Sequence, residues 1–479
     1  MKFRFPLFAA CLLGFFVPST YAFTPADQNA LKEFLDGNPV TDLGLVVSSN
    51  KLEGALTEAP WAGYYWPEGF GGVTTPFRDP SFPHAQISLW RSDSGFNRTN
   101  RWMKKKWGLS LTPIESSLSN EEVDKLGAAL KYDLLISEND YTLTHTILNR
   151  IADKARKVRI KAWEGICNGW TLAALAVDRP LHSVQVKSAS GRMITFYPHD
   201  LMALAAQLYA RSPINGWNWF TRDAEFMRTS IFLKDGENPP ANANFEPVWL
   251  KFIGKRCEKN DQVNGCGDLN AGIFHTAIVN SIGFNNSAFI MDKHKSPAIG
   301  NAVAYSYQAK LYNTETGKGG PYPEILSTHL NDEEKNKGAV SKVGVEMTLT
   351  TRKELVPFSL DLEKEKNYQD FEESDQHHYD YVLLLNIKNE VIDGEWKMRV
   401  PLLGAENQLF PIYPDFLWKL PVKNTRAFSG YEGSLSASEF TLQNGLPESW
   451  KQIAAEAGKH EQPLGTVLYQ LIDASRTLQ

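Results

Sequence analysis

The spacing of hydrophobic and polar positions divides the chain into a loop-rich front, a helical middle and a β-rich back. After a short helical pattern at 26–35, residues up to about 112 are rich in aromatic residues, Pro and Gly and show little periodicity. Helical spacing then predicts helices over 121–130, 142–157 and 200–208. A further helix is expected from about Asn168 to Ala176, because the helix-breaking triplet at 178–180 follows it.

Short apolar or alternating runs predict strands at 184–186, 194–196, 274–282, 288–291, 343–350, 381–387 and 396–400. The runs 274–282 and 288–291 are expected to be neighbouring antiparallel strands of one sheet. Helical spacing returns at 447–478. The predicted fold class is therefore α+β. The expected organisation is a loop-rich region that is a possible pro-segment or cover (23–115), a catalytic core (116–313), a linker or excursion (314–342), a β-rich region (343–430) and a helical tail (431–479).

The first 22 residues have the layout of a secretory signal peptide. Lys2 and Arg4 form a positive start, an apolar run covers 5–17, and small residues stand at Thr20 and Ala22. The apolar run is shorter than the roughly 20 residues that a membrane-spanning helix needs. We expect cleavage after Ala22, a secreted or periplasmic protein, and no membrane anchor once the leader is removed.

Composition and charge narrow the function classes. Of the 479 residues, 42% are hydrophobic and 22% are charged, which argues against a disordered chain. Lys plus Arg number 50 and Asp plus Glu number 55, so the formal net charge is −5. Nucleic-acid partners are not expected, because proteins that bind them usually carry a basic surface.

The four cysteines are informative by position. Cys11 lies in the predicted leader and is expected to leave with it. Cys257 and Cys266 lie in a polar stretch that has the composition of a surface loop. In an oxidising compartment two nearby cysteines usually pair, so a disulfide is expected; a zinc site would need a matching His or Cys pair. Cys167 is then left without a partner.

Cys167 immediately precedes the helix expected at 168–176. A thiol at a helix N-terminus lies close to unpaired backbone N–H groups, which lower its pKa and favour the nucleophilic thiolate. Gly165 and Gly169 allow the backbone to approach a substrate carbonyl. The alternative interpretation is a buried structural cysteine on an Ala-rich helix.

A cysteine nucleophile needs a base, and the base needs a group that orients it. His275 stands in the apolar run expected to be a strand, and Asp292 ends the next expected strand. Antiparallel pairing would bring them side by side. Alternatively, His275 is a core histidine with a satisfied hydrogen bond. His294 is a competitor for the base, although it lies between two lysines in a polar stretch.

Several segments of the chain resemble the secreted transglutaminase-elicitor family, which comprises oomycete cell-wall glycoprotein transglutaminases and bacterial relatives. The most specific runs from Cys266 to His275, and it continues with Asn280, Gly283 and Asp292. Other resembling segments are the Gly-x-Cys-x-Gly-Trp around Cys167 and residues 65–67, 131–135, 195–197, 394–396 and 413–418. They occur in order across about 61–421.

The resemblance implies a papain-like Cys-His-Asp acyltransferase with a helix-borne cysteine packed on an antiparallel sheet. Cys167 would attack the γ-carboxamide of a protein glutamine, His275 would move the protons, and Asp292 would orient the imidazole. The thioester would pass to a lysine or small primary amine, or to water. This chemistry requires no metal and no cofactor, and a Cys257–Cys266 bridge would brace the segment that carries His275.

Two further residue-level expectations concern substrate binding. Trp66 and Trp170 are candidates for an aromatic channel that takes a glutamine or lysine stem, with core packing as the alternative. After Asp292 the family pattern has Val-Trp-Asn before Pro-Val, whereas residues 299–303 read Ile-Gly-Asn-Ala-Val. The missing aromatic residue leaves the preference for the acceptor amine open.

Two other functions are compatible with the same residues. One is a papain-like cysteine peptidase or amidase, because water as well as an amine can capture a thioester. The other is a non-catalytic surface-binding module on the same scaffold, although a binding module has no need for all three of the candidate catalytic residues.

Overall fold

The computed structural model describes residues 23–79, 118–137, 140–158, 160–161, 163–211, 230–233, 250–254, 268–293, 300–355, 372–397, 413–421, 426–433 and 435–477. The predicted leader, Cys257, Cys266 and His294 lie outside these ranges. Within them, no helix is long and apolar enough to cross a membrane.

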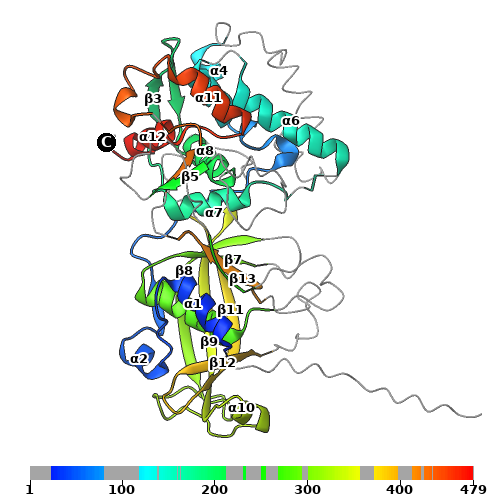
Figure 1. Ribbon diagram of the computed structural model, residues 1–479, viewed down its shortest axis with the longest axis vertical. Helices are drawn as coiled ribbons and strands as arrows, with labels where there is room; N and C mark the ends of the chain where they lie inside the picture. Colours follow the sequence, from blue (N-terminus) through cyan, green and yellow to red (C-terminus); the bar gives the residue numbers. More distant parts are fainter. Residues whose placement is uncertain are drawn as a thin grey trace, which may run out of the picture.

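The molecule is elongated and has a helical half and a sheet half (Figure 1). The helical half, at the top of the view, consists of α4 (Asn120–Asp124), α5 (Ala128–Ile136), α6 (Thr142–Lys157), α7 (Cys167–Ala176), α8 (Pro198–Ala210), α11 (Trp450–Lys459) and α12 (Gly465–Thr477). Two small strand pairs accompany these helices: β3 (Val184–Lys187) with β4 (Met193–Phe196), and β5 (Ser230–Leu233) with β14 (Arg426–Ser429). The helices predicted at 142–157 and 168–176 are confirmed, as are the strands at 184–186 and 194–196.

The sheet half is built on an eight-stranded sheet in the order β12-β11-β9-β8-β7-β13-β6, with β1 paired to β8 beside β7. The strands are β1 (Glu53–Ala55), β6 (Lys251–Gly254), β7 (Phe289–Asp292), β8 (Asn301–Tyr312), β9 (Ser341–Arg352), β11 (Ser374–Leu385), β12 (Val391–Trp396) and β13 (Phe416–Lys419). All neighbouring strands of this sheet pair in antiparallel orientation. The α+β fold class is thus confirmed.

Because β8 pairs directly with β9, the predicted linker at 314–342 leaves this sheet and returns to it, carrying α10 (Asp332–Asn336). The predicted boundaries at 313 and 343 therefore fall inside one sheet.

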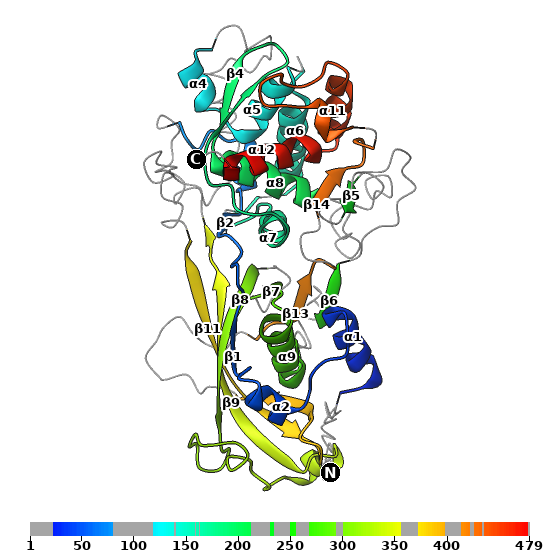
Figure 2. The same cartoon turned by 90° about the vertical axis from the view of Figure 1, so that its left-hand side faces the viewer.

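Helices cover both faces of the sheet where β7, β8 and β13 meet. α9 (Ala271–Ile278), with α1 (Pro25–Leu35) and α2 (Leu43–Ser48) beside it, covers one face (Figure 2). α7 packs on β8 from the helical half. Successive side chains of a strand point to opposite faces, and Phe289 and Met291 accordingly join the core around α9, whereas Ile290 joins the core of the helical half.

The prediction of a strand at 274–282 is wrong, because these residues form α9 and the π-helical turn η7 (Val279–Phe284). Asn270 starts the helix, since its side chain accepts hydrogen bonds from the N–H groups of Gly272 (2.9 Å) and Ile273 (3.2 Å). The helix is buried on every side, so its sequence has no polar face. A short apolar run of this kind cannot be told from a buried strand by periodicity.

Candidate active site

Cys167 is the first residue of α7, so the helix begins one residue before the predicted start and the thiol lies at its N-terminus as expected. The loop before it is fixed against the segment that follows β2 (Gly63–Tyr64): the N–H of Ile166 donates to the carbonyl oxygen of Tyr65 at 2.7 Å. A Cβ on Gly165 would lie 2.0 Å from that same oxygen, so this position requires glycine. The backbone that presents the thiol is thus held in one position.

A network of charges holds the same loop from the side of α6. The carboxylate of Glu68 accepts from Arg150 and from Lys154, both at 2.6 Å, and Lys154 also reaches Glu164 at 2.7 Å. The N–H of Glu68 donates to the carbonyl of Glu164 at 2.9 Å. Burial alone would raise the pKa of Glu68, but Arg150, Lys154 and Arg211 lower it to about 2. The loop that carries the thiol is therefore tied to an ionised, buried carboxylate.

Asn301 is the side chain that reaches the thiol from the sheet. Its Nδ2 lies 3.4 Å from Sγ of Cys167. Asn301 is the first residue of β8, and Asp292 stands directly opposite it at the end of β7. Oδ1 of Asp292 accepts from the N–H of Gly300 at 2.9 Å. Asp292 thus holds the backbone immediately before Asn301, whose amide reaches the thiol.

The electrostatic surroundings of Cys167 disfavour the thiolate. Burial is the largest cause, and with the negative charges of Glu354 and Asp292 it raises the pKa of Cys167 to about 12. The hydrogen bonds from Asn301 and from the N–H of Asn168 act in the opposite direction. The predicted effect of the helix start is present, but it is outweighed, and the thiol is protonated at neutral pH in this arrangement.

Glu354 lies on β10 (Glu354–Leu355), which pairs with β2 in parallel. Its Oε1 accepts from Nε1 of Trp170 at 3.4 Å, one helical turn beyond Cys167. Burial raises the pKa of Glu354, while Lys293 and the Trp170 bond lower it. This carboxyl group was not predicted from the sequence, because β10 is too short to give a pattern.

The structure separates His275 from the other candidate residues. His275 is in the middle of α9, where it is 2% exposed, and its Nδ1 lies 2.8 Å from Oη of Tyr381. Burial lowers its pKa to about 4. Within the described ranges, Nε2 has no hydrogen-bond partner.

Alternation along β7 and β8 places Asp292 and Asn301 on the face that α7 covers, opposite the face of α9. The sheet therefore lies between His275 and the thiol. The predicted pairing of His275 with Asp292 does not form in this structure, because the segment that carries His275 is a helix and not the neighbouring strand.

Trp66 and Trp170, the two candidates for a substrate channel, are 2% and 0% exposed. Trp66 packs against Tyr64 and Phe77, and Trp170 packs against Trp61. Both rings are part of the core around α7 in this conformation.

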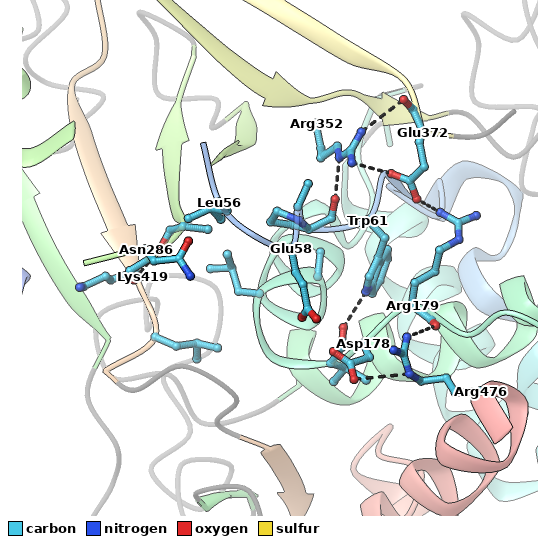
Figure 3. Close-up of a pocket in the computed structure, with 18 of the residues that line it drawn as sticks. Leu56, Glu58, Trp61, Asp178, Arg179, Asn286, Arg352, Glu372, Lys419 and Arg476 are labelled. Atoms are coloured by element: carbon cyan, nitrogen blue, oxygen red, sulfur yellow. Dashed lines mark hydrogen bonds and ion pairs between the residues drawn. The ribbon is translucent and has the colours of Figure 1, made fainter. Parts of the chain in front are cut away.

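A cavity of about 410 Å³ opens at the other end of α7 (Figure 3). From this helix and its exit it is lined by Ala174, Leu175, Val177, Asp178, Arg179 and Leu181. Glu372 ties its walls together, because its carboxylate bonds Arg179 and Arg352 and accepts from the N–H of Ala62. The indole of Trp61 closes the wall toward Trp170 by donating to the carbonyl of Val177 at 2.8 Å. In the described part of the chain, no three His, Cys, Asp or Glu residues could together hold a metal ion.

Comparison with known proteins finds a family match in the part of the chain that forms most of the sheet. A family model described as "Transglutaminase elicitor" matches residues 259–432. The resemblance to the transglutaminase-elicitor family is confirmed. A crystal structure of the GP42 transglutaminase from Phytophthora sojae is 17% identical, with a TM-score of 0.49, and the alignment covers 91% of this chain and 99% of that one. Among proteins with curated descriptions, none matches the sequence.

The segment matched to the transglutaminase-elicitor family contains His275, Asp292, Asn301 and Glu354, and it ends well after them. Cys167 lies before it. One signal could have found Asn301: in the resemblance described for residues 299–303, it corresponds to the Asn of the Val-Trp-Asn that the resemblance implies.

Proposed function

We propose that the protein is an exported acyltransferase of the protein-glutamine γ-glutamyltransferase type, with Cys167 as its nucleophile. The observation that carries this proposal is the contact of the Asn301 amide with Sγ at the start of α7. A structural cysteine needs no hydrogen-bond donor at its sulfur. A sulfur that develops negative charge gains from one, because a buried charge is costly unless it accepts a hydrogen bond.

In the proposed reaction, Sγ of Cys167 attacks the γ-carboxamide carbon of a protein glutamine. The thiol proton accompanies the amide nitrogen, which leaves as ammonia, and a thioester forms. A primary amine then attacks the thioester and gives an isopeptide bond, or water attacks and gives glutamate. Asn301 donates to the sulfur, and Asp292 acts through the backbone N–H of Gly300, which it holds in place beside Asn301.

The histidine of this mechanism is an open assignment between two residues. His275 lies behind the sheet and is neutral at pH 7, since its pKa is about 4. His294 follows Asp292 by two positions in the sequence and lies outside the described residues. No step of the mechanism above is therefore assigned to His275.

The test is incorporation of a fluorescent primary amine into a glutamine-rich protein, comparing the wild type with Cys167→Ala and Asn301→Ala. We expect no incorporation by the first variant and a reduced rate for the second. A wild type that cleaves peptides and incorporates no amine would instead be a cysteine peptidase. A wild type with neither activity, even after limited proteolysis of its N-terminal region, would be a binding module.

The proposal includes export of the protein. Export would use the leader predicted at 1–22, and an oxidising compartment would favour the Cys257–Cys266 bridge. N-terminal sequencing of protein recovered from the periplasm or medium is expected to begin at Phe23. Mass spectrometry of an unreduced digest is expected to find the two cysteines in one linked peptide.

A further inference from the structure

Two carboxyl groups beside a cysteine nucleophile need an explanation. Cysteine nucleophiles are usually activated by nearby positive charge, which stabilises the thiolate. Here Asp292 stands opposite the residue that contacts Sγ, and Glu354 is bonded to the indole one turn along the same helix. Both negative charges disfavour the thiolate.

The same charges have the opposite effect in the second half of the proposed reaction. Once Cys167 is acylated, the sulfur is part of a neutral thioester and no longer meets an electrostatic penalty from its neighbours. The incoming lysine or alkylamine is an ammonium ion at neutral pH, since its pKa is about 10.4. A carboxylate beside the thioester attracts this cation and can accept its proton.

The two carboxyl groups differ in their availability. Asp292 is 0% exposed and holds the Gly300 N–H. Glu354 is partly exposed, and Trp170 is its single hydrogen-bond donor within the described ranges. Its bond to Trp170, the residue one turn beyond Cys167 on α7, places it where a second substrate would approach the thioester.

We propose that Glu354 is the residue that recognises the acceptor amine, binding the ammonium group of a lysine or alkyl primary amine beside the thioester. This inference rests on the proposed acyl transfer. Glu354 takes one proton from the ammonium, and the neutral amine forms the new C–N bond as the C–S bond breaks. The departing sulfur takes a second proton from the same nitrogen, so that an amide, a thiol and a protonated Glu354 remain. Glu354 then returns its proton to solvent.

The direction in which the pKa of Glu354 is shifted agrees with a role in accepting a proton. Because burial raises its pKa, the carboxyl group holds a proton more readily than an exposed glutamate does.

The test is Glu354→Gln, which keeps an acceptor for Trp170 and removes the charge. Two nucleophiles are compared on one glutamine donor: a dansylated five-carbon diamine, which is cationic, and hydroxylamine, which is uncharged at neutral pH. We expect kcat/KM for the cationic amine to fall at least about tenfold, the usual scale for losing a charge-assisted hydrogen bond. Hydroxamate formation and ammonia release in the absence of amine are expected to stay at wild-type level or rise.

Glu373→Gln is the matched control, because Glu373 is an exposed carboxylate that pairs with Lys353 next to Glu354 in the chain. It is expected to discriminate between the nucleophiles as the wild type does. Equal losses for both nucleophiles in Glu354→Gln would overturn the proposal, and so would an equal selective loss in Glu373→Gln. A wild type that releases no ammonia from glutamine would refute the acyl transfer itself, which is a different outcome.

Discussion

Two short apolar helices, α7 and α9, cover opposite faces of the sheet, and each carries one candidate catalytic residue. The surroundings of these two residues differ. α7 and α9 are both almost wholly buried; α7 packs on β8, and α9 packs on β11 and β12 of the same sheet. Cys167 is the first residue of its helix and reaches the strand end at Asn301, whereas His275 lies within its helix and contacts Tyr381. A side chain at the start of a buried helix stays available for chemistry, and one within the helix becomes part of the core.

The two helices also differ in the kind of contact that holds them in place. Behind α7 the supporting contacts are ionic, with Glu68 between Arg150 and Lys154. Around α9 they are aromatic: Phe274 lies 4.8 Å from Tyr379 and 5.1 Å from Trp396, measured between ring centroids. Changes that act on charge are therefore expected to affect the two faces differently.

The largest expected effect is on the ionic side. Glu68→Gln leaves Arg150, Lys154 and Arg211 without their shared anion, which should lower the free energy of unfolding by roughly 3 kcal/mol. Chemical denaturation monitored by circular dichroism measures this. Glu456→Gln on α11 removes an exposed pair with Lys459 and is expected to cost less than about 0.5 kcal/mol. Equal losses in the two variants would contradict a special role for the Glu68 network.

The second expected effect is on the pH dependence of stability, which should differ between the two faces. His275 has a lowered folded-state pKa of about 4, so its neutral form adds stability above about pH 6.5, and that stability is lost as the pH falls toward 4. Glu68 loses its contribution only at lower pH, from about 4.5 toward 2. Unfolding free energies should fall between pH 6.5 and 4.5 in the wild type by roughly 2 kcal/mol and more shallowly in His275→Gln. An unchanged slope in that variant would mean that His275 is not buried neutral.

These features differ in how far the sequence reveals them. The helix start at Cys167 and the strands β9 and β11 carry local signals, either glycines beside a helical pattern or apolar and alternating runs along the strand. The helix α9 carries none, because burial on all sides removes the polar face that distinguishes a helix, and Asn270 as its cap is a single-residue signal. The Asn301–Cys167 contact joins residues 134 positions apart. Only the pairing of β7 with β8 and the packing of α7 bring them together.

A smaller effect is expected at the thiol itself. Asn301→Ala removes a donor to Sγ, so the pKa of Cys167 should rise further, and the alkylation rate at a fixed pH should fall by roughly tenfold. Asn301→Asp replaces the donor with another negative charge and should raise the pKa more. The pH dependence of iodoacetamide alkylation at Cys167 measures both. A lower thiol pKa in either variant would show that Asn301 does not stabilise the thiolate.

The smallest expected effect decides the comparison of the two faces. Because the sheet separates His275 from Cys167, His275→Gln should leave amine incorporation per folded molecule unchanged within about twofold, while Asp292→Ala should reduce it by far more through the loss of the Gly300 contact. The folded fraction of each variant, measured by circular dichroism, normalises the rates. His294→Ala is the parallel variant, since His294 is the other histidine that the sequence offers to the mechanism. If folded His275→Gln is inactive, the active enzyme must bring α9 to the thiol, and the separation of the two faces would then describe a resting form.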